Sequence, residues 1–551
     1  MSNRFKAALR GCATVLASAS LGFAPVTDTS DRPQHEHRTT EKVGTVSFAT
    51  SCKAPAQPHF NRAVALLHSF EFRQAIDGFD ATLAADPSCA MAEWGIALSR
   101  WSNPFAVGIR PPAVLRQGAE AVARARKIGA KTPRERAYVD AVSFLYADFE
   151  KLGQPARLMA YRDAMKKVAA TYPGDTEARI FYALAIAVAA SPADKTFADQ
   201  LQAGAILEGL IARQPNHPGL AHYIIHTYDF PALADRSLAA ARRYAAIAPS
   251  VPHALHMPSH TFTRLGYWQD SIDTNIRSAE VARRNNSAAE ELHSMDYRVY
   301  AYLQTAQDRR ARQLVDSLAE VESRFDPEAI GSAAPGWAGI FALAAIPARY
   351  ALERGDWSAA ATLQPRPGKY PYTEALTYFA RAIGAARSGD ASTIQSSIAA
   401  LQRIQSQLTD AKESYWAQQA EIQRRAATAW LAFVEHREDD ALGEMRATAL
   451  LEDDTDKSAV TPGPLAPARE LLGEMLLLMK QPAAARTEFE ATLKKEPNRF
   501  RAVYGAAHAA ALAGDRAAAR RYYDRLLEIC QRADTPRRPE LIEARGTSAS
   551  R

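Results

Sequence analysis

The sequence lacks the short motifs that mark several common classes of protein. It contains no glycine-rich phosphate loop, no nucleophile elbow and no C-x-x-C pair, so nucleotide binding, serine-dependent hydrolysis and thioredoxin-like chemistry have no support. Beyond its N-terminus it also lacks any run of the roughly eighteen uncharged apolar residues that a membrane-spanning helix needs. We therefore expect no transmembrane segment.

Neither sign of charge is in large excess. The 551 residues carry a formal net charge of +6 at pH 7, and the first 24 contribute three basic residues to it and no acidic one, which leaves +3 for the rest. A charge balance this weak and this evenly spread argues against nucleic acid as a partner.

Runs of β-branched residues are scarce as well. The apolar residues are dominated by alanine and leucine, which favours helix. At 47% hydrophobic and 23% charged residues, the composition is that of an ordinary soluble globular protein. The length favours several domains or an elongated array of repeats over a single core.

The N-terminus has the pattern of a secretory signal peptide. Arg4, Lys6 and Arg10 give a basic start, and a short apolar stretch of small residues, GCATVLASASLGFA, follows up to residue 24. An uncleaved N-terminal segment is the alternative. We expect residues 1–24 to be a signal peptide and the mature protein to be periplasmic or secreted.

Cysteine is rare, with four residues in the chain, of which one lies in the expected signal peptide. In an oxidising compartment Cys52 and Cys89 could form a disulfide, although the sequence alone does not decide this. Cys530 would then remain as a small buried apolar residue.

From about residue 56 the sequence follows a pattern of helix, short turn and helix. Ala75, Phe79 and Pro87 stand where a helical hairpin of this kind has its small residue, its aromatic residue and its terminal proline. Pro215 and Pro249 repeat the proline position 34 residues apart. This period resembles the tetratricopeptide repeat (TPR), a helix–turn–helix unit whose copies stack side by side.

The TPR resemblance predicts an all-α fold, a right-handed superhelical solenoid of hairpin repeats, either continuous or divided into two lobes. Breaks in the pattern and composition suggest the following parts: signal peptide 1–24, flexible lead-in 25–55, N-terminal TPR-like lobe 56–330, C-terminal TPR-like lobe 331–532, and disordered tail 533–551. The stretches LLHSFEF, CAMAEWG, HALHMPSHTFTRLGYW and PARELLGEML are also similar to a group of exported bacterial TPR proteins. That resemblance implies no established reaction.

Two histidine pairs stand one repeat apart. His222 and His226 are four residues apart, and so are His256 and His260, so each pair lies on one face of a helix. Corresponding members of the two pairs are 34 residues apart, which makes them neighbours in stacked repeats. His253 lies about one turn before His256, on the same stripe. The four paired imidazoles are therefore expected to converge.

Imidazole is the commonest side-chain ligand for zinc, copper and iron, so this cluster is a candidate site for a divalent transition metal. The core set comprises His222, His226, His256 and His260, with His253, His293 and Asp296 as auxiliary ligands. By resemblance to TPR proteins, these side chains should face the concave groove. Asp229 could orient a ligand from outside the metal shell, and Pro258 should kink its helix.

The chemistry of such a site is open. A metal-dependent hydrolase or oxidase would need groups that move protons, for which Asp296, Tyr297 and Arg264 are the candidates, acting on a small-molecule substrate. The alternative is a non-catalytic periplasmic scaffold that binds a peptide or protein partner in its groove. Structural hydrogen bonding among the histidines is a third interpretation. His68 is expected to have a capping or packing role, and His59 and His217 to lie at the surface.

Overall fold

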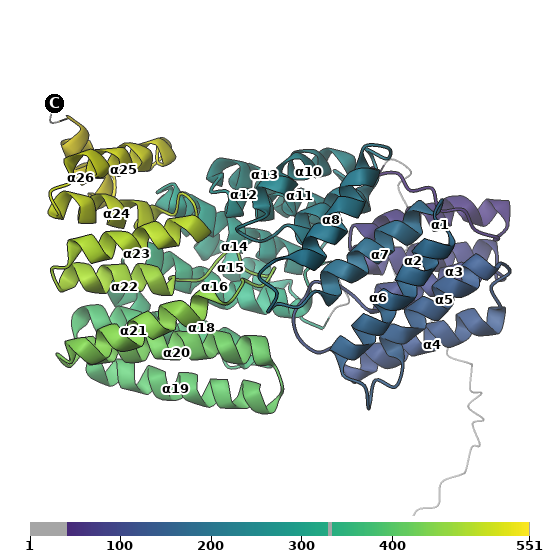
Figure 1. Cartoon of the computed structure of the whole chain (residues 1–551), viewed down its shortest axis with the longest axis horizontal. Coiled ribbons are helices and arrows are strands. Elements are labelled where there is room, and N and C mark those ends of the chain that lie inside the picture. Colours follow the sequence, from purple (N-terminus) through teal and green to yellow (C-terminus); the bar gives the residue numbers. More distant parts are fainter. Residues whose placement is uncertain (1–40, 329–332, 550–551) are drawn as a thin grey trace, which may run out of the picture. The chain divides into compact units, whose positions relative to one another are not determined.

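The computed structural model describes residues 41–328 and 333–549, which contain helices and no β-strand (Figure 1). The first part of the chain forms η1 (Ala54–Ala56), α1 (Gln57–His68), α2 (Phe72–Ala85), α3 (Ala90–Arg100), α4 (Pro112–Ile128), α5 (Pro133–Ser143), η2 (Phe144–Tyr146), α6 (Gln154–Thr171), α7 (Thr176–Ala189), α8 (Ala198–Ile211), α9 (Pro218–Thr227), α10 (Ala234–Ile247), α11 (Pro252–His256), α12 (Pro258–Arg264), α13 (Trp268–Arg284), α14 (Ala288–Gln304) and α15 (Asp308–Ser323). The remainder forms α16 (Gly336–Arg354), α17 (Trp357–Ala361), α18 (Pro371–Ser388), α19 (Ala391–Asp410), α20 (Ser414–Val434), α21 (Glu438–Asp453), α22 (Ala468–Leu478), α23 (Pro482–Lys495), α24 (Phe500–Leu512), α25 (Arg516–Ile529) and α26 (Pro539–Ala549). The prediction of an all-α, TPR-like helical-repeat fold is confirmed.

Helices pack closely because small residues face aromatic rings. Phe79 of α2 lies against Gly95 of α3, where an added Cβ would come within 2.2 Å of the ring. The same arrangement recurs near the C-terminus, where the ring of Phe489 lies against both Gly473 and Gly505. One aromatic ring per hairpin thus fills the space that a neighbouring glycine leaves, as the TPR pattern requires.

Part of the expected lead-in is packed rather than flexible. Residues 42–55 run against the repeats, with Val46 and Phe48 buried and the Thr45 backbone N–H donating to the Asn216 carbonyl at 3.0 Å. The Cys52–Cys89 disulfide is formed, with Cα atoms 4.9 Å apart, and it ties this segment to the first hairpin. The expected signal peptide and residues 25–40 lie outside the described residues.

Packing continues past residue 330, where two lobes were expected to meet. Leu292 and Leu303 of α14 share a core with Leu343 and Ile346 of α16, and Lys42–Arg551 form one compact unit. The expected disordered tail contains α26, which packs on the apolar face of α25 and buries Leu541 there.

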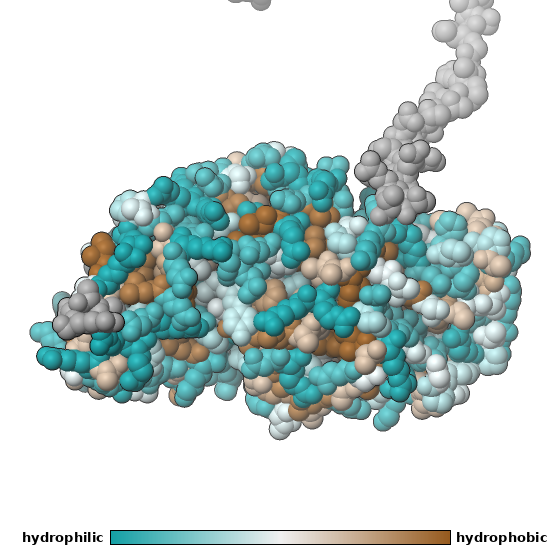
Figure 2. All heavy atoms as spheres, turned by 90° about the horizontal axis from the view of Figure 1, so that it is seen from above, coloured by the Kyte–Doolittle hydropathy of each residue, from teal (hydrophilic) through white to brown (hydrophobic). Residues whose placement is uncertain are grey.

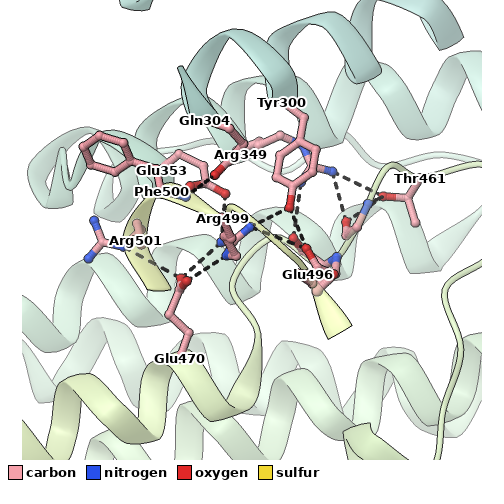
Figure 3. A network of polar contacts seen from close by, with 12 residues as sticks. Tyr300, Gln304, Arg349, Glu353, Thr461, Glu470, Glu496, Arg499, Phe500 and Arg501 are labelled. Atoms are coloured by element: carbon pink, nitrogen blue, oxygen red, sulfur yellow. Dashed lines mark hydrogen bonds and ion pairs between the residues drawn. The ribbon is translucent and has the colours of Figure 1, made fainter. Parts of the chain in front are cut away.

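A buried ionic network fixes α14 from the C-terminal side (Figure 3). The Arg499 guanidinium donates to Glu470 at 2.7 Å and to the Tyr300 hydroxyl at 2.9 Å, and it pairs with Glu353 at 2.8 Å. These groups come from α14, α16, α22 and the residue just before α24. Helix α14 is thereby tied to three other helices.

None of the helices described here is long and apolar enough to cross a membrane. The face seen in Figure 2 is largely hydrophilic, with separate apolar patches between the polar residues.

Gly95→Ala is expected to lower the free energy of unfolding by about 1–3 kcal/mol, because the added Cβ overlaps the Phe79 ring. Gly209 in α8 is the matched control, since nothing lies within 4 Å of a Cβ added there. Gly209→Ala should therefore raise the free energy of unfolding by about 0.5–1 kcal/mol. Urea unfolding followed by circular dichroism measures both changes. A Gly95→Ala protein as stable as its parent would show that α2 and α3 do not pack through this ring.

Candidate metal centre

The six histidines singled out in the sequence lie together and are buried, each at most 6% exposed. They come from α9, α11, α12 and α14, and are His222, His226, His253, His256, His260 and His293. Ring centroids are 4.9 Å apart for His222 and His226, 5.8 Å for His226 and His260, and 4.3 Å for His256 and His293. The 34-residue spacing therefore does bring the two pairs side by side.

Two prolines set the local backbone. Pro252 begins α11 and Pro258 begins α12, and the chain changes from one helix to the next at Met257. Proline has no N–H to continue the hydrogen-bond ladder, and the helix is interrupted at Met257, next to the residue where a kink is expected. His256 and His260 remain close across the break, with ring centroids 5.0 Å apart.

The imidazoles form two groups of three. In each group, the nitrogens that could bind a metal lie within 4.8 Å of one another. The first triad comprises His222, His226 and His253; the second triad comprises His256, His260 and His293. This differs from a single set built on His222, His226, His256 and His260, because each pair stays intact and is completed by a histidine from another helix. His253 and His293 are full members and not auxiliary ones.

Hydrogen bonds fix the tautomers in the second triad. The Nδ1–H of His260 donates to Asp229 at 2.9 Å, and the Nδ1–H of His256 donates to the Asn275 carbonyl oxygen at 2.7 Å. The Asn275 amide donates to the Ser271 carbonyl, so its oxygen must face His256. In the neutral rings both Nε2 atoms then carry lone pairs, and these two atoms are 3.1 Å apart. Two nitrogens on one tetrahedral zinc ion would be about 3.3 Å apart.

The first triad has a similar pair. The Nδ1–H of His222 donates to the His68 carbonyl at 2.6 Å, and His222 Nε2 lies 3.1 Å from His253 Nε2. A proton on His253 Nε2 could satisfy this pair without a metal. Among the described residues, however, three buried nitrogens of the cluster have no hydrogen-bond partner: His226 Nε2, His253 Nδ1 and His293 Nδ1.

Burial keeps the imidazoles uncharged. Removal from water lowers the pKa of five of them well below the ordinary value of 6.5, and it also lowers the pKa of His260, although Asp229 opposes the shift there. Neutral imidazole is the form that binds metal ions. The cluster is therefore competent to bind at neutral pH.

Asp229 supports the second triad from outside. Burial alone would raise the pKa of Asp229, but the Lys457 ammonium and the Arg264 guanidinium hold that pKa well below its usual range. Arg264 donates to one carboxylate oxygen at 2.9 Å and Lys457 to the other at 3.0 Å. Asp229 thus orients His260 and not its chain neighbour His226, and Arg264 orients Asp229.

The other two candidates for proton transfer are placed differently. The Tyr297 hydroxyl lies 3.4 Å from His260 Nε2 and donates to the Thr461 carbonyl at 3.1 Å, so it borders the second triad. Asp296 is bound to Arg349 at 3.1 Å and belongs to neither triad.

Sequence reasoning missed a third group beside the cluster. His68 Nε2 and His217 Nε2 each lie 2.9 Å from a different oxygen of Glu177, and all three residues are buried. The prediction that His217 lies at the surface is therefore wrong. Both rings can donate from Nε2 to the carboxylate, while His217 Nδ1 has no hydrogen-bond partner among the described residues. No short-range signal marks this group, because the His68–Glu177 contact spans 109 residues.

The cluster does not line an open groove. The segment between α21 and α22, residues 454–467 and here called the covering segment, borders the same cavity as four of the histidines. Lys457 of this segment pairs with Asp229 at 3.0 Å. The Arg349 guanidinium donates to the Thr461 hydroxyl at 3.2 Å (Figure 3). Phe105 stacks on His226 with ring centroids 4.3 Å apart. The cavity that remains is lined in part by His226, His253, His260 and His293, and offers about 20 Å³ to the centre of a water-sized ligand, little more than one water needs.

Comparisons with known proteins give no family. No protein-family model and no curated protein sequence matches the chain. Among solved structures, the human IFIT1 dimer with m7Gppp-AAAA is 11% identical and covers 81% of this chain and 90% of its own, with a TM-score of 0.35. A monomeric IFIT1 mutant with Gppp-AAAA is 10% identical and covers 87% and 98%, with a TM-score of 0.34. Similarity at this level does not identify a ligand for this chain.

Histidine modification tests the burial of the cluster. We expect diethyl pyrocarbonate to modify the exposed His59 and His436 in the native protein while the six clustered histidines react at least about tenfold more slowly, because the reagent needs an accessible nitrogen. Peptide mass spectrometry after a timed reaction measures each site. Rapid modification of His226 or His260 would show instead an open groove of the kind that a peptide-binding scaffold needs.

Proposed function

We propose that this protein binds a late first-row transition-metal ion at the second triad. The observation that carries the proposal is the pair of Nε2 atoms of His256 and His260, 3.1 Å apart, whose rings have both committed their Nδ1 proton elsewhere. Two lone pairs at that distance repel unless a proton or a cation lies between them. Burial disfavours the proton, because it would leave an imidazolium charge in the core.

The types of ligand limit which metal ions the second triad is suited to bind. Three imidazoles with no thiolate and no carboxylate among them suit copper, zinc or iron, with copper(II) the tightest-binding of the divalent ions. Three protein ligands leave at least one coordination position open. Asp229 on the far side of His260 raises the basicity of that ring and fixes its orientation.

The size of the cavity limits the chemistry. Space for about one water admits hydroxide or a diatomic molecule, but no larger substrate while the covering segment is in place. We therefore propose that a reaction at this metal, of hydrolase or oxidase type, has its metal-bound ligand restricted to that size, with Tyr297 as the nearest proton-bearing group. The buried histidines offer a peptide no contact, so no observation favours the scaffold.

The proposed location is outside the cytoplasm. The Cys52–Cys89 disulfide supports this proposal, because such bonds persist mainly in oxidising compartments. The basic and apolar pattern of the first 24 residues agrees with it.

Elemental analysis of untagged protein tests the proposal. We expect the parent protein to carry stoichiometric transition metal, and His260→Ala to weaken binding at the second triad by more than about tenfold, because one of three ligands is lost. His59→Ala, which removes an exposed histidine, should leave the metal content unchanged. Circular dichroism confirms that both variants fold. Metal-free parent protein that also fails to bind added zinc or copper would refute the proposal.

The Asp229→Asn substitution tests whether Asp229 strengthens metal binding through its hydrogen bond with His260. We expect a loss of about 10–100-fold in metal affinity, since the ring of His260 loses its charged acceptor. The substitution also leaves Lys457 and Arg264 without their buried counter-ion, so the free energy of unfolding should fall by about 3–5 kcal/mol. Asp235→Asn, at an exposed position on α10, is the control. Competition with a chromophoric chelator measures affinity, and an Asp229→Asn protein with unchanged affinity would exclude this role.

A further inference from the structure

We propose that the two triads hold two metal ions that share one small bridging ligand, and so form a single binuclear centre. This inference rests on the proposed function, because it requires that the second triad binds metal. It goes further in assigning the first triad as a second site and in naming the ligand between the two ions as water-derived, a hydroxide or an anion of similar size.

The first argument is the number of donors. Six imidazoles exceed the four ligands of a tetrahedral ion, and among the described residues the nitrogens that lie mutually within 4.8 Å fall into two sets of three. A single ion would leave one set unused in the core. The first triad also contains a close pair of Nε2 atoms: His222 is fixed by a backbone carbonyl, and its Nε2 atom lies 3.1 Å from that of His253.

The second argument is that the triads share one cavity. His226 and His253 of the first triad line it together with His260 and His293 of the second. Across the boundary, ring centroids are 5.8 Å apart for His226 and His260 and 6.0 Å for His253 and His256. The three unpartnered nitrogens of the cluster all belong to residues that line this cavity. The space is therefore bounded by donors from both sides and fits a ligand of one or two heavy atoms.

The third argument is charge. Each triad has one buried carboxylate at its edge: Asp229 is 2.9 Å from His260 Nδ1, and Glu290 is 3.8 Å from His253 Nδ1. Two divalent ions bring four positive charges into a region where Arg264 and Lys457 already balance Asp229. An anionic bridge between the ions reduces that excess, which is why hydroxide is favoured over neutral water.

The test uses full-length, untagged, metal-free protein titrated with copper(II), followed by mass spectrometric metal analysis and electron paramagnetic resonance. The parent protein is expected to bind two copper ions per chain, and the second ion should quench the signal of the first, because bridged copper(II) ions couple magnetically. His222→Gln removes a ligand of the first triad and His256→Gln one of the second. Each variant should bind one ion and give the full signal of one isolated spin. His59→Gln is the matched surface control and should behave as the parent.

The outcomes separate the two proposals. Binding of a single ion at the second triad, lost in His256→Gln and kept in His222→Gln, would overturn the binuclear centre and leave the proposed function standing. Two ions with fully additive signals would overturn the shared bridge. No bound copper in the parent protein would overturn the proposed function itself. If a variant fails to fold, the number of ions and the signal of the parent protein still separate a bridged pair of ions, two uncoupled ions, one ion and none.

Discussion

The site depends on one constraint: the Nε2 atoms of His256 and His260 face each other 3.1 Å apart. In the neutral rings, neither of these nitrogens carries a proton that could lie between them. Asp229 and Asn275 create it, because each accepts the Nδ1 proton of one ring. A purely structural cluster would have the opposite arrangement, with each ring donating to the next. The group of His68, His217 and Glu177 shows a different arrangement in the same chain, in which one carboxylate can accept a hydrogen bond from each of two rings. The contrast between these neighbouring groups argues for a cation at the second triad.

The covering segment gives the site its second property, which is exclusion of bulk water. Lys457 of this segment forms an ion pair with Asp229. Backbone carbonyls of the segment accept the other hydrogen bonds: that of Thr461 from the Tyr297 hydroxyl, and those of Gly463 and Pro464 from the Arg349 guanidinium. Burial under the covering segment raises the free-energy cost of any unbalanced charge. The same burial strengthens the interaction between a metal ion and its ligands. Burial also lowers the pKa of Lys457 to about 8, so the contact with Asp229 depends on a cation that is itself costly to bury.

The sequence predicts the fold and the residues that gather at the site, because both follow from the 34-residue repeat. A 34-residue repeat makes His226 and His260 neighbours, and α12 begins at Pro258, which has no N–H to continue the preceding helix. The division into triads is not predictable in this way, since it depends on which rotamer each ring adopts against residues such as Asn275. The burial of His217 and the position of the covering segment depend on contacts across more than a hundred residues. The sequence identifies Asp229 as a carboxylate that could orient a ligand, but it does not say which ring. The structure shows that this ring is His260 in the adjacent repeat.

The C-terminal repeats carry none of the clustered histidines, yet the site depends on them. Arg349 of α16 contacts both Asp296 on α14 and Thr461 in the covering segment, so one buried guanidinium sets the distance between the helix that carries His293 and the segment that closes the cavity. The Arg499 network holds α14 one turn further along through Tyr300 (Figure 3). Since breaking a buried ion pair costs about 3–5 kcal/mol, these contacts keep α14 in one position against α12. A metal centre built across several helices needs this rigidity, because His293 on α14 must stay close to His256 and His260 to complete the second triad. The later hairpins are therefore part of the support of the site.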